Sequence, residues 1–149
     1  MLKQGEYADV LRAIGWTLDQ RLAGSDVAAV EIAIRGAGIV VSWQTGDGER
    51  QRERYGREEV AQLRERARQL REEPAHGPPG EQAESLRTIG QYLDEQQIVL
   101  ERLIKLPEGH RVVGVLDWHS MAEWYPRATI GEMSAKRRKL RGTGKRLSP

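Results

Sequence analysis

The apolar and polar positions of this chain recur with two periods, one typical of helices and one typical of strands. Over residues 7–22, apolar side chains lie three or four positions apart, which predicts an amphipathic helix that stops near Gly24. Two β-branched segments follow and are joined by glycines that permit a tight turn, so we expect a hairpin. A charged edge strand and a second amphipathic helix complete the pattern. The predicted helix, three strands and helix are residues 7–22, 27–34, 38–44, 49–55 and 57–73.

A short sequence from the first helix returns in the second half of the chain. LRAIGWTLD at residues 11–19 is echoed by LRTIGQYLD at residues 86–94, with six of nine positions identical. The same offset carries Trp43 onto Trp118, within a later apolar strand. We interpret the chain as one module written twice, and the alternative is a common helix pattern that occurs twice. The later strands and final helix of the second half are predicted at residues 98–106, 110–118, 124–130 and 132–140.

The segment between the two halves is unsuited to helix or central strand. Residues 74–80 contain three prolines and two glycines. The sequence therefore predicts an α+β protein of two tandem αβββα modules with antiparallel three-stranded sheets and a basic C-terminal arm. The modules are expected to pack together through their sheets or first helices, unless a partner chain covers the exposed face. The predicted parts are module 1 at residues 1–73, the linker at 74–80, module 2 at 81–141 and a flexible basic tail at 142–149.

Gly15 and Gly90 occupy the same position in the two first helices. Glycine inside a helix costs about 1 kcal/mol relative to alanine, which suggests the close approach of another backbone. We expect each glycine to face a strand of its own module. The alternative is a contact between the two helices.

Composition and charge narrow the classes of function. The 149 residues include no cysteine, which excludes disulfides, thiolate catalysis and cysteine-based metal sites. No apolar run is long enough for a membrane span, and residues 1–10 do not resemble a signal peptide, so we expect a cytoplasmic protein. The formal net charge is only +2, but the seven basic residues from Lys136 onward are accompanied by no acid. The rest of the chain is therefore acidic, and the basic arm can contact phosphates or simply aid solubility.

Candidate catalytic chemistry is sparse. His76 and His110 are expected to be exposed, because one lies in the linker and the other beside a hairpin turn. Asp117, His119 and Ser120 are near neighbours on one strand end and do not converge as a triad would. The glycine pairs lack the spacing and the following helix of a phosphate loop. We predict a protein that is not an enzyme and has no cofactor or metal site.

Aromatic side chains gather directly before the basic arm. Residues 118–127 hold three of the eight aromatic residues, and exposed Trp and Tyr beside Arg can stack on bases or anchor a protein. The alternative is that Trp118 is buried like Trp43, while Trp124 and Tyr125 cover the sheet edge. The leading prediction is binding of RNA or a ribonucleoprotein, and the alternative is a scaffold that binds another protein or its own second copy. The predicted nucleic-acid-binding residues are Trp124, Tyr125, Arg127, Lys136, Arg137, Arg138, Lys139, Arg141, Lys145 and Arg146.

The order of elements and one basic segment carry a resemblance. The αβββα order is similar to that of the double-stranded RNA-binding domain, and residues 131–139 resemble the lysine-rich start of its second helix. The first half departs from that family, because Glu58 and Glu59 stand where phosphate contacts belong. The whole chain also resembles uncharacterised bacterial proteins with a duplicated helix and antiparallel-sheet module. These resemblances imply a topology and carry no activity.

Overall fold

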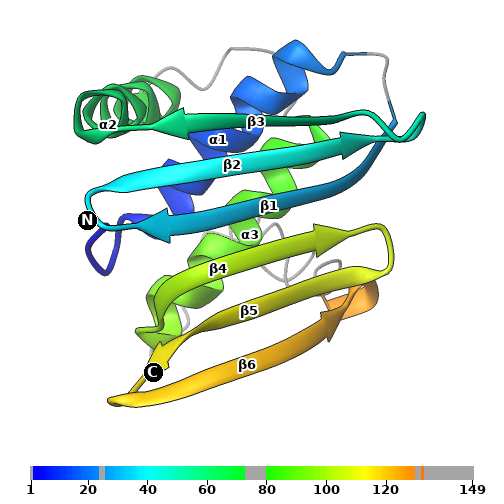
Figure 1. The fold of residues 1–149 in the computed structure, drawn as a ribbon. Helices are drawn as coiled ribbons and strands as arrows, with labels where there is room; N and C mark the ends of the chain where they lie inside the picture. The colour runs from blue at the N-terminus through cyan, green and yellow to red at the C-terminus, as the bar shows by residue number, and fades with distance from the viewer. Residues whose placement is uncertain (1, 24–25, 73–79, 130–131, 133–149) are drawn as a thin grey trace, which may run out of the picture.

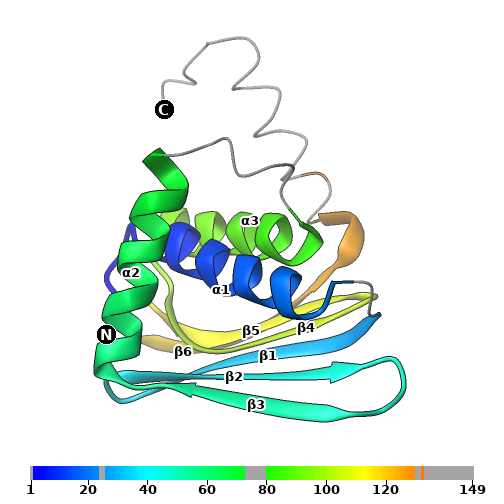
Figure 2. The ribbon, with the colours of Figure 1, turned by 90° about the horizontal axis from the view of Figure 1, so that it is seen from above.

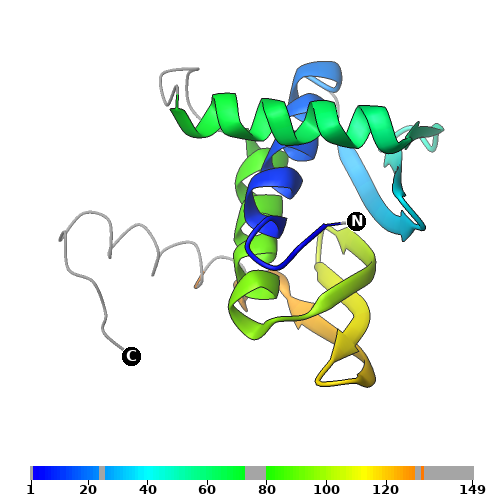
Figure 3. The same cartoon turned by 90° about the vertical axis from the view of Figure 1, so that its left-hand side faces the viewer.

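The protein folds as one antiparallel sheet with helices on one of its faces (Figures 1 and 2). The computed structural model describes residues 2–23, 26–72, 80–129 and 132. Helices α1 and α3 lie on the sheet, and α2 packs across α1 (Figure 3). The elements are α1 (Tyr7–Arg21), β1 (Val27–Arg35), β2 (Gly38–Thr45), β3 (Arg50–Tyr55), α2 (Arg57–Glu72), α3 (Glu81–Gln96), β4 (Val99–Leu106), β5 (Gly109–Leu116) and β6 (His119–Pro126).

The six strands form a single sheet in the order β3-β2-β1-β4-β5-β6. Strands β1 and β4 pair antiparallel from Val30↔Lys105 to Ala33↔Arg102, and this pairing joins the two halves of the chain. The predicted α+β class is confirmed, but the two predicted three-stranded sheets are joined edge to edge into one sheet of six strands. Pairing β1 with β4 satisfies the backbone groups of two sheet edges and, among the described strands, leaves β3 and β6 as edges. It also lets one helix layer cover a larger continuous core.

The last strand and its turn differ from the predicted ones. Strand β6 is His119–Pro126 instead of residues 124–130, because Asp117 and Trp118 form the turn before it with φ of 50° and 68°. Trp118 is consequently 97% exposed at the tip of a hairpin, whereas Trp43 is 6% exposed in the core. The predicted equivalence of these two tryptophans is therefore wrong. The predicted helix at residues 132–140 lies almost entirely outside the described residues.

The length of one connection explains why Trp118 is not equivalent to Trp43. Helix α1 is joined to β1 by residues 22–26, whereas α3 is joined to β4 by only residues 97–98. Gly38 and Gly109 each begin the second strand of their hairpin. Counted from these glycines, Trp43 corresponds to Gly114. The offset that aligns the two helices therefore does not align the strands that follow them.

Helices α1 and α3 run antiparallel and touch through their glycines. A Cβ atom added to Gly15 would lie 2.5 Å from the carbonyl oxygen of Gln82 and 2.6 Å from Cα of Ala83. A Cβ atom added to Gly90 would lie 2.6 Å from the carbonyl oxygen of Tyr7. The prediction that each glycine faces a strand of its own half is wrong, and the helix contact that was its alternative is observed.

Each of these two helices is capped by an aspartate from the other. The carboxylate of Asp94, near the end of α3, accepts hydrogen bonds from the backbone N–H groups of Gly5 (2.8 Å), Tyr7 (3.0 Å) and Ala8 (3.0 Å). The carboxylate of Asp19, near the end of α1, accepts bonds from the N–H groups that begin α3. Those donors are Gln82 (3.1 Å) and Ala83 (2.9 Å). Neither N-cap residue bonds its own helix through a side chain. Negative charge at these helix starts also complements the helix dipole.

Removing either cap is expected to weaken the fold measurably. Asp19→Ala and Asp94→Ala should each lower the free energy of unfolding by about 1 to 2 kcal/mol, because buried N–H donors lose their acceptors. Gln20→Ala is the matched control, since Gln20 is exposed on the same helix. Urea unfolding followed by circular dichroism measures the effect. Equal stability of the two aspartate variants and the control would show that the caps contribute nothing.

Candidate functional site

The sheet has one face that the described helices do not cover (Figures 1 and 2). Alternate residues of a strand point to opposite faces, and paired residues share a face. The strand pairing therefore defines rows of side chains across this face. We call it the open face, and it comprises two such rows together with Arg35 and Arg50. The first row is Arg52, Ser42, Glu31, Ile104, Arg111 and Trp124, and the second is Arg54, Val40, Ala33, Arg102, Val113 and Ala122.

The open face is strongly basic. Its residues include six arginines and one carboxylate, that of Glu31. Glu31 accepts a hydrogen bond from Nε of Arg102 at 2.6 Å. The other five arginines make no ion pair with any described residue, so their charge is not neutralised within that part of the chain. They are Arg35, Arg50, Arg52, Arg54 and Arg111.

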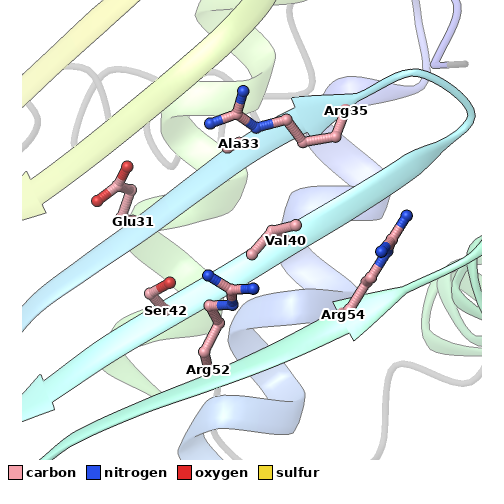
Figure 4. Close-up of a pocket in the computed structure, with 7 residues that line it drawn as sticks. All are labelled: Glu31, Ala33, Arg35, Val40, Ser42, Arg52 and Arg54. Atoms are coloured by element: carbon pink, nitrogen blue, oxygen red, sulfur yellow. The ribbon is translucent and has the colours of Figure 1, made fainter.

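Two adjoining cavities hollow the half of the open face that contains β1, β2 and β3. One cavity, of about 520 Å³, is lined by Arg35, Arg52 and Arg54 around Val40, with Glu31 and Ser42 at one side (Figure 4). The other, of about 460 Å³, shares Glu31, Ser42 and Arg52 with the first and extends to β4. Its further lining residues include Gln44, Arg50, Ile104 and Leu106. Together they form a continuous depression whose charged lining consists of four guanidinium groups and the carboxylate of Glu31.

The other half of the open face, on β4, β5 and β6, holds Arg102 and Arg111 among apolar side chains and one exposed indole ring. Trp124 on β6 is 43% exposed, and its indole ring extends over Gly109 of the neighbouring strand. A Cβ atom at Gly109 would lie 2.7 Å from Cζ2 of that ring, so glycine provides the space in which the ring lies. Ile104 and Val113 are partly exposed on the adjacent strands, and Arg111 stands directly opposite Trp124. A flat aromatic ring is thus presented beside a cation.

The structure separates the two aromatic residues that the sequence placed together. Trp124 and Tyr125 are successive residues of β6, so their side chains point to opposite faces of the sheet. Tyr125 lies on the helix side, stacked on His110 with ring centroids 5.0 Å apart. The hydroxyl of Tyr125 donates to the hydroxyl of Tyr92, at 3.1 Å, and to the carboxylate of Glu123. Burial and these hydrogen bonds raise the pKa of Tyr125. Only Trp124 belongs to the open face.

The predicted basic residues are not brought to the open face within the described part of the chain. Arg127 follows β6, and its guanidinium lies 3.6 Å from the carboxylate of Glu81. It lines a separate cavity of about 580 Å³, where Arg127 and Lys105 are accompanied by three acids, Asp19, Asp26 and Glu81. This mixture favours neither sign of ligand charge. The remaining predicted contacts lie outside the described residues: Lys136, Arg137, Arg138, Lys139, Arg141, Lys145 and Arg146.

His110 is buried, and the prediction that it is exposed is wrong. The register of β5 turns its ring to the helix side, where it is 1% exposed and faces Lys105 and Tyr125. Burial, together with the charge of Lys105, lowers the pKa of His110 to about 4. Its Nδ1 finds no hydrogen-bond partner among the described residues. His119 is exposed at the start of β6, and His76 lies outside the described residues.

Sequence reasoning missed the arginines of the open face. The signal is the alternation of arginine in RQRERY, which places Arg50, Arg52 and Arg54 on one side of β3. In the sequence alone, this charge indicates an edge strand, where arginines can meet water. The alternation becomes a candidate site only when Arg35, Arg102 and Arg111 are found on the same face, and that requires the pairing of all six strands.

Other kinds of site receive no support. In the described ranges, no three His, Asp or Glu side chains gather as metal ligands would. No helix in those ranges is both long and apolar enough to cross a bilayer. Comparison of the chain with protein-family models, with curated proteins and with solved structures finds no match. Among the described residues, the open face is the feature that points to a ligand.

Proposed function

We propose that the protein binds nucleic acid, with RNA as the leading ligand, across the open face of its sheet. The observation that carries this proposal is the presence of six arginines and one carboxylate on a face that the described helices leave uncovered. Arginine binds phosphate through two parallel hydrogen bonds. Each phosphate that it neutralises releases counterions, which makes the affinity depend on salt.

The spacing of the arginines supports a linear anion as the ligand. Arg50, Arg52 and Arg54 alternate along β3, so their Cα atoms are about 7 Å apart. Arg35, Arg102 and Arg111 extend the charge across the sheet to β5. A small anion would need two or three converging guanidinium groups, whereas a polymer of phosphates can use a spread of this size. The strand backbone holds all six side chains on one face before any ligand arrives.

Three further predictions from the sequence belong to the proposal: the duplication of one module, phosphate binding by the basic arm, and a cytoplasmic location. We propose that the two halves arose from duplication of one module, an origin supported by the repeated LRxIG sequence and by the reciprocal caps of Asp19 and Asp94. The basic arm of residues 136–149 would add further phosphate contacts of low sequence specificity. A cytoplasmic location agrees with the lack of cysteine, because disulfides form in oxidising compartments.

Charge reversal on the open face tests the proposal. Arg52→Glu with Arg54→Glu should raise the Kd for a fluorescein-labelled oligouridine of about 16 nucleotides at least tenfold, measured by fluorescence anisotropy. We also expect the affinity of the variant to depend less on salt than that of the wild type. Between about 50 and 200 mM salt, the slope of the logarithm of the association constant against the logarithm of the salt concentration should be smaller in magnitude by about 1.4, because two phosphate contacts are lost. Both expectations follow from the loss of guanidinium groups that have no partner within the described residues.

A matched control changes the same number of charges elsewhere. Lys3→Glu with Arg66→Glu reverses two exposed cations of the helix side and should change the Kd less than threefold. Removal of residues 136–149 should weaken binding while leaving the effect of the open-face variant intact. The proposal fails if the control weakens binding as much as the open-face variant. It also fails if the truncated protein no longer distinguishes the two variants.

A further inference from the structure

The open face is divided into a cationic half and an aromatic half. Four arginines lie on β1 and β3, where they line the two adjoining cavities: Arg35, Arg50, Arg52 and Arg54. The only aromatic side chain in the two rows, that of Trp124, lies on the opposite edge strand. Neighbouring strands are about 4.8 Å apart, so β3 and β6 are separated by about 24 Å. A ligand that contacts both halves must therefore be extended.

We infer that the ligand is a single-stranded nucleic acid whose phosphates lie on the β1–β3 half and whose base stacks on Trp124. This inference rests on the proposed function and adds to it the form of the nucleic acid and its direction across the sheet. A single strand offers unstacked base faces together with phosphates. In a duplex the base faces are covered by their neighbours, and only phosphates and base edges remain accessible.

The surroundings of Trp124 suit base stacking. The indole ring extends over Gly109, where the absence of a Cβ atom lets it lie close to the sheet while the side chain stays 43% exposed. Partly exposed Ile104 and Leu106 on β4 continue the apolar surface toward the arginines. Arg111, opposite Trp124, can neutralise the phosphate of the stacked nucleotide. One nucleotide would then use the ring and the cation together.

The competing occupant of such a surface is an acidic peptide with apolar side chains. Six arginines also complement glutamates, and a tryptophan also packs against aliphatic groups. Every unit of a nucleic acid carries a charge, whereas the carboxylates of such a peptide are interspersed with apolar side chains, and the four clustered arginines of the β1–β3 half favour the denser charge. We therefore assign the face to a single strand and make peptide binding an outcome of the test.

The experiment measures the binding of oligouridine, polyphosphate, an RNA duplex and a glutamate-rich peptide, and it uses two variants of Trp124. Trp124→Ala should raise the Kd for oligouridine about tenfold, while its Kd for polyphosphate, which has charge and no bases, should change less than twofold. Trp124→Phe should recover most of the affinity for oligouridine, because the phenyl ring retains a stacking face. Trp118→Ala is the matched control, since Trp118 is 97% exposed at a hairpin tip and should have no effect. The wild-type protein should bind oligouridine more tightly than an RNA duplex of equal length.

The possible failures are distinguishable. If Trp124→Ala binds oligouridine like the wild type while the Arg52 and Arg54 reversal still weakens binding, base stacking is wrong and phosphate binding stands. The inference is also overturned if the protein binds the RNA duplex more tightly than the single strand. It is likewise overturned if the protein binds a glutamate-rich peptide more tightly than oligouridine. If neither the tryptophan nor the arginine variants change binding, both the inference and the proposed function are wrong.

Discussion

Gly15→Ala and Gly90→Ala are each expected to lower the free energy of unfolding by about 3 kcal/mol, although alanine is the better helix former. The added Cβ atom would lie within about 2.6 Å of backbone atoms in the facing helix, too close for any van der Waals contact. Backbone cannot rotate away as a flexible side chain can. The two helices must therefore move apart, and this movement would loosen the packing around both glycines and both aspartate caps.

Two effects of opposite sign compete in this prediction. Helix propensity alone would make each alanine variant about 1 kcal/mol more stable than the wild type. Overpacking against a rigid backbone costs more than that, so the variants should be less stable. The double variant should lose less than the sum of the single variants, since one separation of the helices relieves both overlaps.

Denaturant unfolding provides the measurement. The midpoint and the slope from urea titrations give the free energy of unfolding for each variant, with Gln20→Ala as the exposed control on α1. An increase in stability of Gly15→Ala or Gly90→Ala would show that the helices are not in backbone contact. In that case the antiparallel helix pair described here would be wrong.

Acid should destabilise the protein through His110 by about 3 kcal/mol between pH 7 and pH 4. The pKa of His110 is about 4 in the folded protein and about 6.5 in the unfolded chain. Between these values the unfolded chain binds the extra proton, so stability is complete above about pH 6.5 and declines as the pH falls toward 4. The charged form is disfavoured because the ring is 1% exposed and Lys105 faces it.

His110→Leu isolates this contribution. The ring of His110 also stacks on Tyr125, which contacts Tyr92 and bonds to Glu123, and the variant leaves these three residues unchanged. The variant should lose about 3 kcal/mol less than the wild type between pH 7 and pH 4. His119→Ala, which removes an exposed histidine, should retain the wild-type pH dependence. Identical pH profiles for the wild type and His110→Leu would contradict the burial of His110.

The order of elements could be predicted from the sequence because it depends on local patterns. Apolar spacing marks the helices, and glycine pairs mark turns such as the one between Arg35 and Gly38. The meeting of the two halves depends on a pairing of β1 with β4, between residues as distant as Val30 and Lys105. No local pattern encodes that contact, and so two separate sheets were predicted.

The faces of the strands were less predictable than the strands themselves. A change of register by one residue moves a side chain from the core to the solvent, and the register of β5 is set by its hairpin turns. The sequence places His110 beside a turn and so predicts that it is exposed, whereas the register turns it to the core. The equivalence of Trp118 with Trp43 fails for another reason, the shorter connection before β4. The arginines of β3 lie in a segment that the sequence predicts only as a charged edge strand, because their role depends on which face the helices cover. That information exists only in the assembled fold.

Side-chain NMR of the ¹⁵N-labelled protein tests most directly whether the open face binds single-stranded RNA. On titration with oligouridine, the indole N–H of Trp124 and the Nε–H signals of Arg35, Arg52, Arg54 and Arg111 should shift together. The indole signals of Trp43, which is buried, and Trp118, which lies at the hairpin tip, should stay unchanged. Shifts confined to arginines of α2, or an unchanged Trp124 signal at saturating RNA, would contradict the account.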